Sequence, residues 1–288
     1  MNSSTPTSEP NADTVERDPS LPSERDWVRR ARHRLRSRWS ESPSLYLSIA
    51  RRRYPGPSPE VVGSQTRLVI DGYTRSATTF AVYAFQLAQP RPVRLAHHLH
   101  APAQLIEAVR SHVPAIALIR EPEGAILSQA VREPGVAIAD ALASFTRFYS
   151  CLMPYRADLV VGEFEQVTGD FGGVIRAVNE RFATSFSSFE TTPENLEVIL
   201  DLAGQRSTRI PEWFHALLSF ESGLIDFGEL SAVRERTCQA EPEEGLESWV
   251  PSASRREMKD RLRKRWDDPR LEQSRSRAHE VFERFLAG

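Results

Sequence analysis

The sequence predicts an α/β fold, a three-layer sandwich in which helices cover both faces of a central parallel sheet. Short apolar runs typical of buried strands alternate with longer segments of helical periodicity between residues 68 and 203. Parallel strands require crossover connections, and helices supply these connections in such alternating chains. The 288 residues are 40% hydrophobic, which is enough to form the core of one large domain or two small ones.

Each expected element follows from its local pattern. The strand segments are short and rich in aliphatic and β-branched residues; they are 68–72, all or part of 92–99, 115–120 and 158–164. The helical segments repeat their apolar residues three and four positions apart, as Val174 and Val178 do. These segments are 80–89, 102–112, 123–131, 138–150, 170–182, 193–203 and 268–286. The carboxyl ends of the strands share one edge of the sheet, where such folds bind ligands.

The chain is expected to have three regions. Residues 1–24 are rich in Ser, Pro, Thr, Asn and acids, which is typical of a disordered tail. Residues 25–59 form a basic N-terminal arm, in which ten arginines interleave with apolar residues up to position 53. The arm is either an amphipathic surface for an anionic partner or a membrane, or a helix pair that packs its apolar side on the domain. The main domain is 60–288, and its segment 205–250 is either an acceptor-binding lid or a set of helices capping the sheet.

The charge and the cysteine content bear on the class of protein. A net charge of −2 gives no general attraction for nucleic acid. Cys151 and Cys238 are far apart and lack metal-binding spacing, which is typical of a reduced, cytoplasmic protein. We find no apolar run near the ~20 residues of a membrane helix, and no apolar signal core at the N-terminus. The oligomeric state is left open.

The most informative stretch follows the first expected strand. Gly72 ends the run LVIDG, and small, hydroxylic residues then precede the next helix. A strand, a tight loop and a helix N-terminus form an anion site, because loop amides point inward and the helix dipole adds about half a positive charge. Hydroxyl and guanidinium side chains supply further donors; they belong to Arg75, Ser76, Thr78 and Thr79.

This loop has the frame of a nucleotide-triphosphate P-loop, but Thr78 stands where that motif has its lysine. The segment 73–80, YTRSATTF, resembles the 5′-phosphosulfate loop Y-P-[KR]-S-G-T-[ST]-[WFL] of sulfotransferases that use 3′-phosphoadenosine 5′-phosphosulfate (PAPS). Thr74 replaces the proline of that pattern, and Ala77 replaces its glycine, a residue favoured at left-handed loop positions. The resemblance implies a P-loop NTPase-like topology and PAPS as the sulfuryl donor.

A second motif follows the third expected strand. Arg120 ends that strand, and Ser128 lies eight positions later, a little over two helical turns away. The segment 119–128, IREPEGAILS, resembles the family's R-[ND]-P-x-[DE]-x-x-x-S, in which the Arg and the Ser hold the 3′-phosphate. The alternative is an arginine that only satisfies a helix end or a surface carboxylate.

A histidine-rich segment follows the second expected strand. HLHAP at 98–102 resembles the family's K-T-H-x-P, which implies that His100 removes the acceptor proton and that His98 replaces the lysine. A histidine titrates near neutrality and suits that role. Alternation along a strand would place both histidines on one face, but a metal needs a third ligand that the sequence does not clearly offer, so no metal is expected. The alternatives are a structural role for His100 and a carboxylate base, such as Glu107 or one within 205–250.

Two weaker similarities lie further along the chain. VVGEFEQV at 160–167 resembles the family's strand end [YF]-E-D-L and implies that Phe164 lies near the adenine, although an aromatic residue there also suits the core. Residues 250–260 resemble a segment of bacterial members that closes over the 3′-phosphate, with Ser252, Arg255 and Arg256 as candidates. The alternative for this segment is the basic start of a C-terminal helix.

Together the motifs imply a sulfotransferase domain that moves a sulfuryl group from PAPS to a hydroxyl or amine of a small-molecule, glycan or lipid acceptor. Arg75 is expected to stabilise the sulfuryl group, with help from His98 if that ring is protonated. The loop residues that the resemblance assigns to the donor are Arg75, Ser76, Ala77, Thr78, Thr79 and Phe80. A P-loop small-molecule kinase and a non-catalytic nucleotide-binding module are the competing interpretations.

Overall fold

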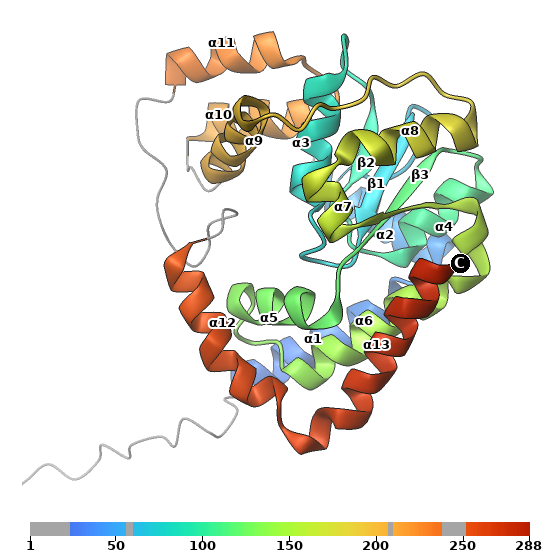
Figure 1. Ribbon diagram of the computed structural model, residues 1–288, viewed down its shortest axis with the longest axis vertical. Helices are drawn as coiled ribbons and strands as arrows, with labels where there is room; N and C mark the ends of the chain where they lie inside the picture. The colour runs from blue at the N-terminus through green and yellow to red at the C-terminus, as the bar shows by residue number, and fades with distance from the viewer. Residues whose placement is uncertain (1–23, 56–59, 207–209, 238–251) are drawn as a thin grey trace, which may run out of the picture.

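The computed structural model describes residues 24–55, 60–206, 210–237 and 252–288. Within these residues, the centre of the fold is a sheet of four parallel strands in the order β2-β1-β3-β4 (Figure 1). The strands are β1 Leu68–Gly72, β2 Leu95–His97, β3 Ala115–Ile119 and β4 Val160–Glu163. The predicted α/β class with a central parallel sheet is confirmed.

Helices cover both faces of this sheet, because successive strand residues point into opposite layers. Val69 belongs to one hydrophobic cluster, whereas Leu68 and Ile70 belong to the other. The helices on the Val69 face are α2 Pro43–Arg53, α4 Pro102–Arg110, α5 Pro122–Arg132, α6 Ile138–Leu152 and α13 Glu272–Ala287. Those on the Ile70 face are α3 Thr78–Ala88, α7 Phe164–Gly169, α8 Phe171–Phe182, α9 Pro193–Gln205, α10 Pro211–Glu221 and α11 Phe227–Thr237. Burial on both faces explains why the strands are continuous apolar runs.

The second strand, Leu95–His97, is part of the segment 92–99 in which a strand was expected. It ends at His97 because His98 and His100 have left-handed φ angles of 57° and 50° that an extended strand cannot contain. The expected helix at 102–112 ends at Arg110, and the closing helix begins at Glu272 instead of 268. Short 3-10 helices lie at Met153–Asp158 and Pro269–Leu271, and α12 Ala253–Trp266 packs against α5.

The basic N-terminal arm packs on the domain as two helices, α1 Glu24–Trp39 and α2. α1 lies against α6, and Asp140 of α6 accepts from Arg30 Nε at 2.9 Å and from Arg34 Nε at 2.7 Å. α2 lies against α4 and buries Leu47 and Ala50 in the core. These contacts are the ones expected from the interpretation of the arm as a helix pair packed on the domain. The predicted disordered tail lies outside the described residues except for Glu24, which begins α1.

The segment predicted as a lid contributes to the core. Trp213 and Phe220 of α10 and Leu230 of α11 are buried in the cluster on the Ile70 face. α10 packs on both α3 and α11. Helices α10 and α11 therefore lie outside α3, as Figure 1 shows. Residues 238–251 of the predicted lid lie outside the described residues. No helix in the described part of the chain combines the length and apolar character needed to cross a membrane.

Candidate functional site

The predicted phosphate loop connects the end of β1 with the start of α3. Thr78 is the first residue of α3, so the amides of this first turn have no partner within the helix. Arg75 and Ala77 adopt left-handed conformations with φ of 69° and 68°. Ala77 therefore occupies a conformation that favours glycine, as the substituted glycine of the motif led us to expect. The loop has the strand–loop–helix geometry of an anion site.

A cavity of about 640 Å³ lies at this edge of the sheet and brings most of the predicted residues together. Of those residues, its lining contains Arg75, Ala77, Thr78, Thr79, Phe80, His98, His100, Arg120, Ser128, Phe164, Ser252, Arg255 and Arg256. The side chain of Ser76 is completely buried and is not part of this lining.

The sequence motifs converge because β3 ends beside the loop and α5 begins at once. Glu121 caps α5 by accepting from the amides of Glu123 and Gly124. This cap fixes the first turn, so that Ser128 two turns later faces Arg75, whose Nε donates to Ser128 Oγ at 3.0 Å. Arg120, just before the cap, stacks its guanidinium 3.7 Å from the centre of the Phe164 ring. Arg120, predicted to hold the 3′-phosphate, and Phe164, predicted to lie near the adenine, therefore contact each other directly.

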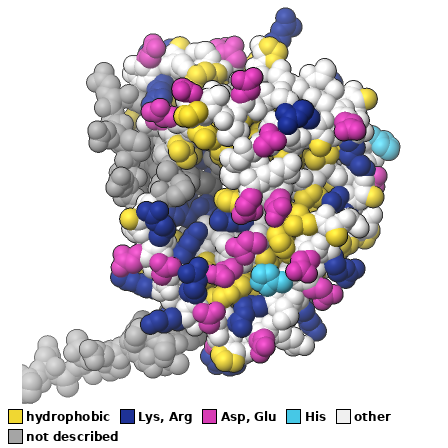
Figure 2. All heavy atoms as spheres, viewed as in Figure 1, with side chains coloured by type: hydrophobic (Ala, Val, Ile, Leu, Met, Phe, Trp, Pro, Cys, Tyr) yellow, Lys and Arg dark blue, Asp and Glu magenta, His cyan; other side chains and the backbone are white. Residues whose placement is uncertain are grey.

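The cavity carries a strong excess of positive charge. Six cationic side chains line it, and Glu133 is the carboxylate among the described lining residues. The cations are Arg75, Arg120, Arg132, Arg255, Arg256 and Lys259. Burial, together with the neighbouring cations, lowers the pKa of Arg75 to about 9 and that of Lys259 to about 8. Figure 2 shows Lys and Arg side chains gathered over α12, which supplies Arg255, Arg256 and Lys259. Such a cluster is stabilised by a bound anion.

His100 has the protonation state of a general base. Its Nδ1 lies 2.9 Å from the carbonyl oxygen of Gly72, which can only accept, so Nδ1 carries the hydrogen and Nε2 keeps its lone pair. Burial is the main cause that lowers the pKa of His100 to about 4, and the charges of Arg36 and Arg206 lower it further. The ring is therefore neutral at neutral pH.

Asp71 holds the backbone of His100 in its left-handed conformation. Its completely buried carboxylate accepts from the His100 amide at 3.2 and 3.1 Å, from the Gly72 amide at 2.9 Å and from Gln104 Nε2 at 3.1 Å. Burial raises the pKa of Asp71 to about 7, and these hydrogen bonds act in the opposite direction. Asp71 is a residue that sequence analysis missed, since an acid inside a strand run carries no motif.

His98 is also neutral, which corrects the expectation of a protonated ring. Nε2 lies 3.0 Å from Thr79 Oγ1, and Nδ1 lies 2.7 Å from His97 Nδ1. Burial lowers the pKa of His98 well below its usual value, and the charge of Arg206 lowers it further. His98 is therefore a neutral hydrogen-bond partner of the Thr79 hydroxyl.

One cluster in the described structure has the composition of a metal site. His97, His98 and Glu221 offer ligand atoms within 4.8 Å of one another. Glu221, however, binds Arg206 through both oxygens at 2.8 and 3.0 Å and accepts from Tyr83 at 2.8 Å. A carboxylate neutralised by a bidentate guanidinium is engaged as an ion pair. We assign Glu221 to this buried pair.

The structure adds lining residues that no motif predicted. Arg132 and Lys259 extend the cationic lining, and α9 supplies an apolar wall that includes Ile199 and Leu200. Glu133 also lines the cavity, whereas the carboxylate proposed as an alternative base, Glu107, is not in the lining and accepts from Ser111. In the sequence, Glu133 is marked only by its position just after the expected helix that became α5. The sequence as a whole matches no model of a protein family and no curated protein.

Proposed function

We propose that this protein is a PAPS-dependent sulfotransferase with a P-loop NTPase-like topology, in which His100 is the general base. The observation that carries the proposal is the charge of the large cavity, where six cations and one carboxylate from the described residues surround a neutral histidine. Such a site favours a ligand with several anionic groups and a reaction that removes a proton.

Two buried donors support a ligand with separate anionic groups. Thr78 Oγ1, at the start of α3, and Arg120 Nε, at the end of β3, are buried without a hydrogen-bond partner among the described groups. Buried donors usually have a partner, and an anionic oxygen would supply one for each. Phe80 and Phe164 line the same cavity and offer aromatic surface for a purine.

The residues have distinct roles in the proposed reaction. Arg75 and the first-turn amides of α3 hold the phosphosulfate and stabilise the charge that develops on it. Arg120 and Ser128 hold the 3′-phosphate, and α12 adds cations above it. His100 Nε2 accepts the proton of the acceptor hydroxyl while its Nδ1–H remains on Gly72. The bond from sulfur to the acceptor oxygen forms as the bond to the phosphate oxygen breaks, and adenosine 3′,5′-bisphosphate leaves.

A small-molecule kinase is the second candidate, because the loop has the P-loop frame. A kinase of that type needs a lysine at the β- and γ-phosphates and carboxylates or hydroxyls for Mg²⁺. Thr78 stands at the lysine position, and Glu133 is the carboxylate that the described lining provides. These features favour a sulfuryl donor over a magnesium nucleotide.

Calorimetry separates these functions. Adenosine 3′,5′-bisphosphate is titrated in EDTA, and ATP is titrated with and without Mg²⁺. We expect the bisphosphate to bind in EDTA more tightly than ATP binds under either condition. ATP binding that depends on Mg²⁺ and exceeds bisphosphate binding would favour the kinase. Failure of the bisphosphate to bind would refute the sulfotransferase.

A further inference from the structure

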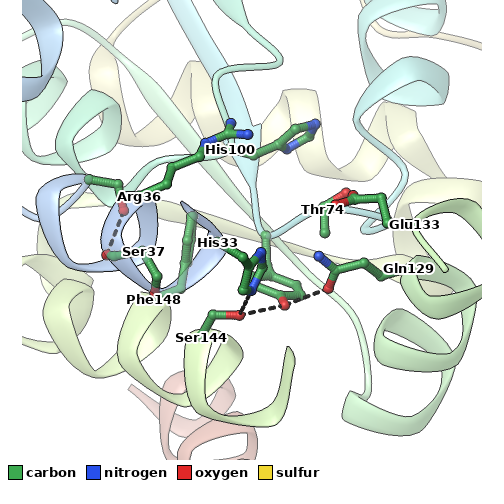
Figure 3. Close-up of a pocket in the computed structure, with 11 residues that line it drawn as sticks. His33, Arg36, Ser37, Thr74, His100, Gln129, Glu133, Ser144 and Phe148 are labelled. Atoms are coloured by element: carbon green, nitrogen blue, oxygen red, sulfur yellow. Dashed lines mark hydrogen bonds between the residues drawn. The ribbon is translucent and has the colours of Figure 1, made fainter. Parts of the chain in front are cut away.

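We propose that the acceptor binds in a second, smaller cavity on the α1 side of His100, and that it presents a small neutral polyol group, such as the hydroxymethyl end of a sugar. This inference rests on the proposed function and adds the place and the chemical class of the acceptor. The cavity has a volume of about 100 Å³ and lies between α1, the start of the phosphate loop, α5 and α6 (Figure 3).

The two cavities share a wall that contains the proposed base. Thr74, His100 and Glu133 line both of them. Sulfuryl transfer requires the acceptor oxygen to lie between the base and the sulfur, within reach of each. A hydroxyl group of an acceptor in the small cavity, held where the two cavities meet at Thr74, His100 and Glu133, would lie beside His100 and face the donor in the large cavity.

The small cavity is rich in groups that both donate and accept hydrogen bonds. Six of its lining side chains carry a hydroxyl or an amide, namely Ser37, Ser40, Tyr73, Thr74, Gln129 and Ser144. Figure 3 shows a chain of hydrogen bonds through Ser144, whose Oγ lies 3.1 Å from His33 Nε2 and 2.9 Å from the Tyr73 hydroxyl. The Tyr73 hydroxyl in turn donates to Gln129 Oε1 at 2.6 Å. A fixed array of this kind complements the hydroxyl groups of a polyol.

The charges in the small cavity balance, which favours a neutral acceptor. Arg36 contributes one positive charge and Glu133 one negative charge. Burial lowers the pKa of His33, so this ring is neutral at neutral pH. The contrast with the six cations of the large cavity indicates that the two sites select different ligands. A volume of about 100 Å³ suits a few hydroxylated carbons instead of a polycyclic phenol.

The proposal gives the N-terminal arm a direct function. His33, Arg36 and Ser37 all come from α1 and form one wall of the small cavity. Arg36 is fixed beside the histidine segment, because its Nη2 donates to the Leu99 carbonyl and its Nε donates to the Tyr46 hydroxyl, both at 3.2 Å. The arm therefore shapes the acceptor site from outside the strand–loop–helix unit.

The test fills the small cavity and leaves the large one unchanged. Ser37→Trp adds bulk in the cavity, and Ser48→Trp adds the same bulk on the exposed surface of α2 as a control. The full-length protein is supplied with PAPS and with methyl glucoside, glycerol or 4-nitrophenol as the acceptor. Adenosine 3′,5′-bisphosphate affinity and circular dichroism are measured for every variant. Saturation-transfer NMR of methyl glucoside, with the bisphosphate bound, reports acceptor binding without turnover.

We expect methyl glucoside and glycerol to be sulfated, and Ser37→Trp to lower kcat/KM for them roughly 10²-fold. The same variant should lose saturation transfer and keep its bisphosphate affinity, while Ser48→Trp behaves like the wild type. Sulfation of 4-nitrophenol alone, or polyol sulfation that Ser37→Trp leaves intact, would overturn the acceptor site while the sulfotransferase stands. Loss of bisphosphate binding in the wild type would overturn both. If Ser37→Trp does not fold, His33→Phe, which removes the hydrogen bond to Ser144 in the same cavity, is judged by the same outcomes.

Discussion

The Nδ1 atom of His100 lies 2.9 Å from the carbonyl oxygen of Gly72, the last residue of β1. This contact fixes the tautomer of the ring in the absence of substrate. Because Gly72 also begins the predicted phosphate loop, the proposed base and the proposed anion site meet at the same strand end. The spacing between them therefore depends on the sheet and not on a mobile segment.

The first prediction concerns the base. His100→Ala should lower kcat by about 10²–10⁴-fold, because general-base catalysis by a positioned side chain contributes that much. Bisphosphate affinity should change little, since His100 is not part of the proposed phosphate contacts. His98→Ala should lower kcat less, because both ring nitrogens of His98 are engaged, with Thr79 and His97, and neither is the proposed proton acceptor. The exposed His215→Ala is the control, and a larger loss in His98→Ala than in His100→Ala would exchange the two roles.

The second prediction concerns pH. A general base must be neutral, and the pKa of His100 is lowered to about 4, so kcat/KM for PAPS should stay high until the pH approaches 4. An unperturbed histidine would lose activity near about 6.5. The bound donor is an anion that favours the protonated ring, so the acid limb of kcat should lie at higher pH than that of kcat/KM. Profiles of both constants check this order, and a limb of kcat/KM near the unperturbed value would contradict the structure.

The third prediction concerns the 3′-phosphate. Arg120→Ala should weaken the binding of adenosine 3′,5′-bisphosphate by about 2–4 kcal/mol, because a charge-assisted contact with the 3′-phosphate is lost. Adenosine 5′-monophosphate lacks the 3′-phosphate and should be affected much less, which separates this loss from the lost stacking on Phe164. Arg263→Ala, on the outer surface of α12 where it pairs with Glu123, is the matched control. Calorimetry that gives equal losses for both nucleotides would remove Arg120 from this role.

The fourth prediction concerns the loop backbone. Ala77 has a φ of 68°, where a Cβ atom costs about 1–2 kcal/mol. Ala77→Gly should therefore raise the free energy of unfolding by up to about 1 kcal/mol, after the entropic cost of glycine is included. The exposed Ala143 of α6 is the control, and Ala143→Gly should lower the free energy of unfolding by about 0.5–1 kcal/mol. Urea denaturation measures both changes, and equal destabilisation by the two substitutions would argue against the left-handed loop.

The fifth prediction concerns the buried ion pair. Arg206→Met should destabilise the fold by about 3–5 kcal/mol, because it removes the guanidinium that neutralises the completely buried carboxylate of Glu221. The double variant Arg206→Met with Glu221→Met removes both charges and should recover a large part of that loss. Denaturation of the wild type, the two single variants and the double variant completes the cycle. Purely additive losses would mean that the pair is not coupled.

The sequence predicted those residues of the site whose place depends on the order of strands, loops and helices along the chain. The loop at 73–80, Arg120 and Ser128 all follow strand ends, and parallel strands bring their ends to one edge. Lys259 could not be predicted in the same way, because it enters the cavity only through the packing of α12 on α5. The small cavity was missed for a similar reason, since it depends on α1 packing against α6, more than 100 residues later in the chain. The left-handed φ of His98 and His100 also left no signal, because neither residue type requires it.

The wall formed by Thr74, His100 and Glu133 has a consequence for the order of events on the protein. Two compartments that meet at one base can be filled at the same time, so neither ligand has to leave before the other arrives. In the proposed reaction the sulfuryl group would therefore pass directly from the donor to the acceptor, without resting on a side chain, and the proposed mechanism would run through a ternary complex.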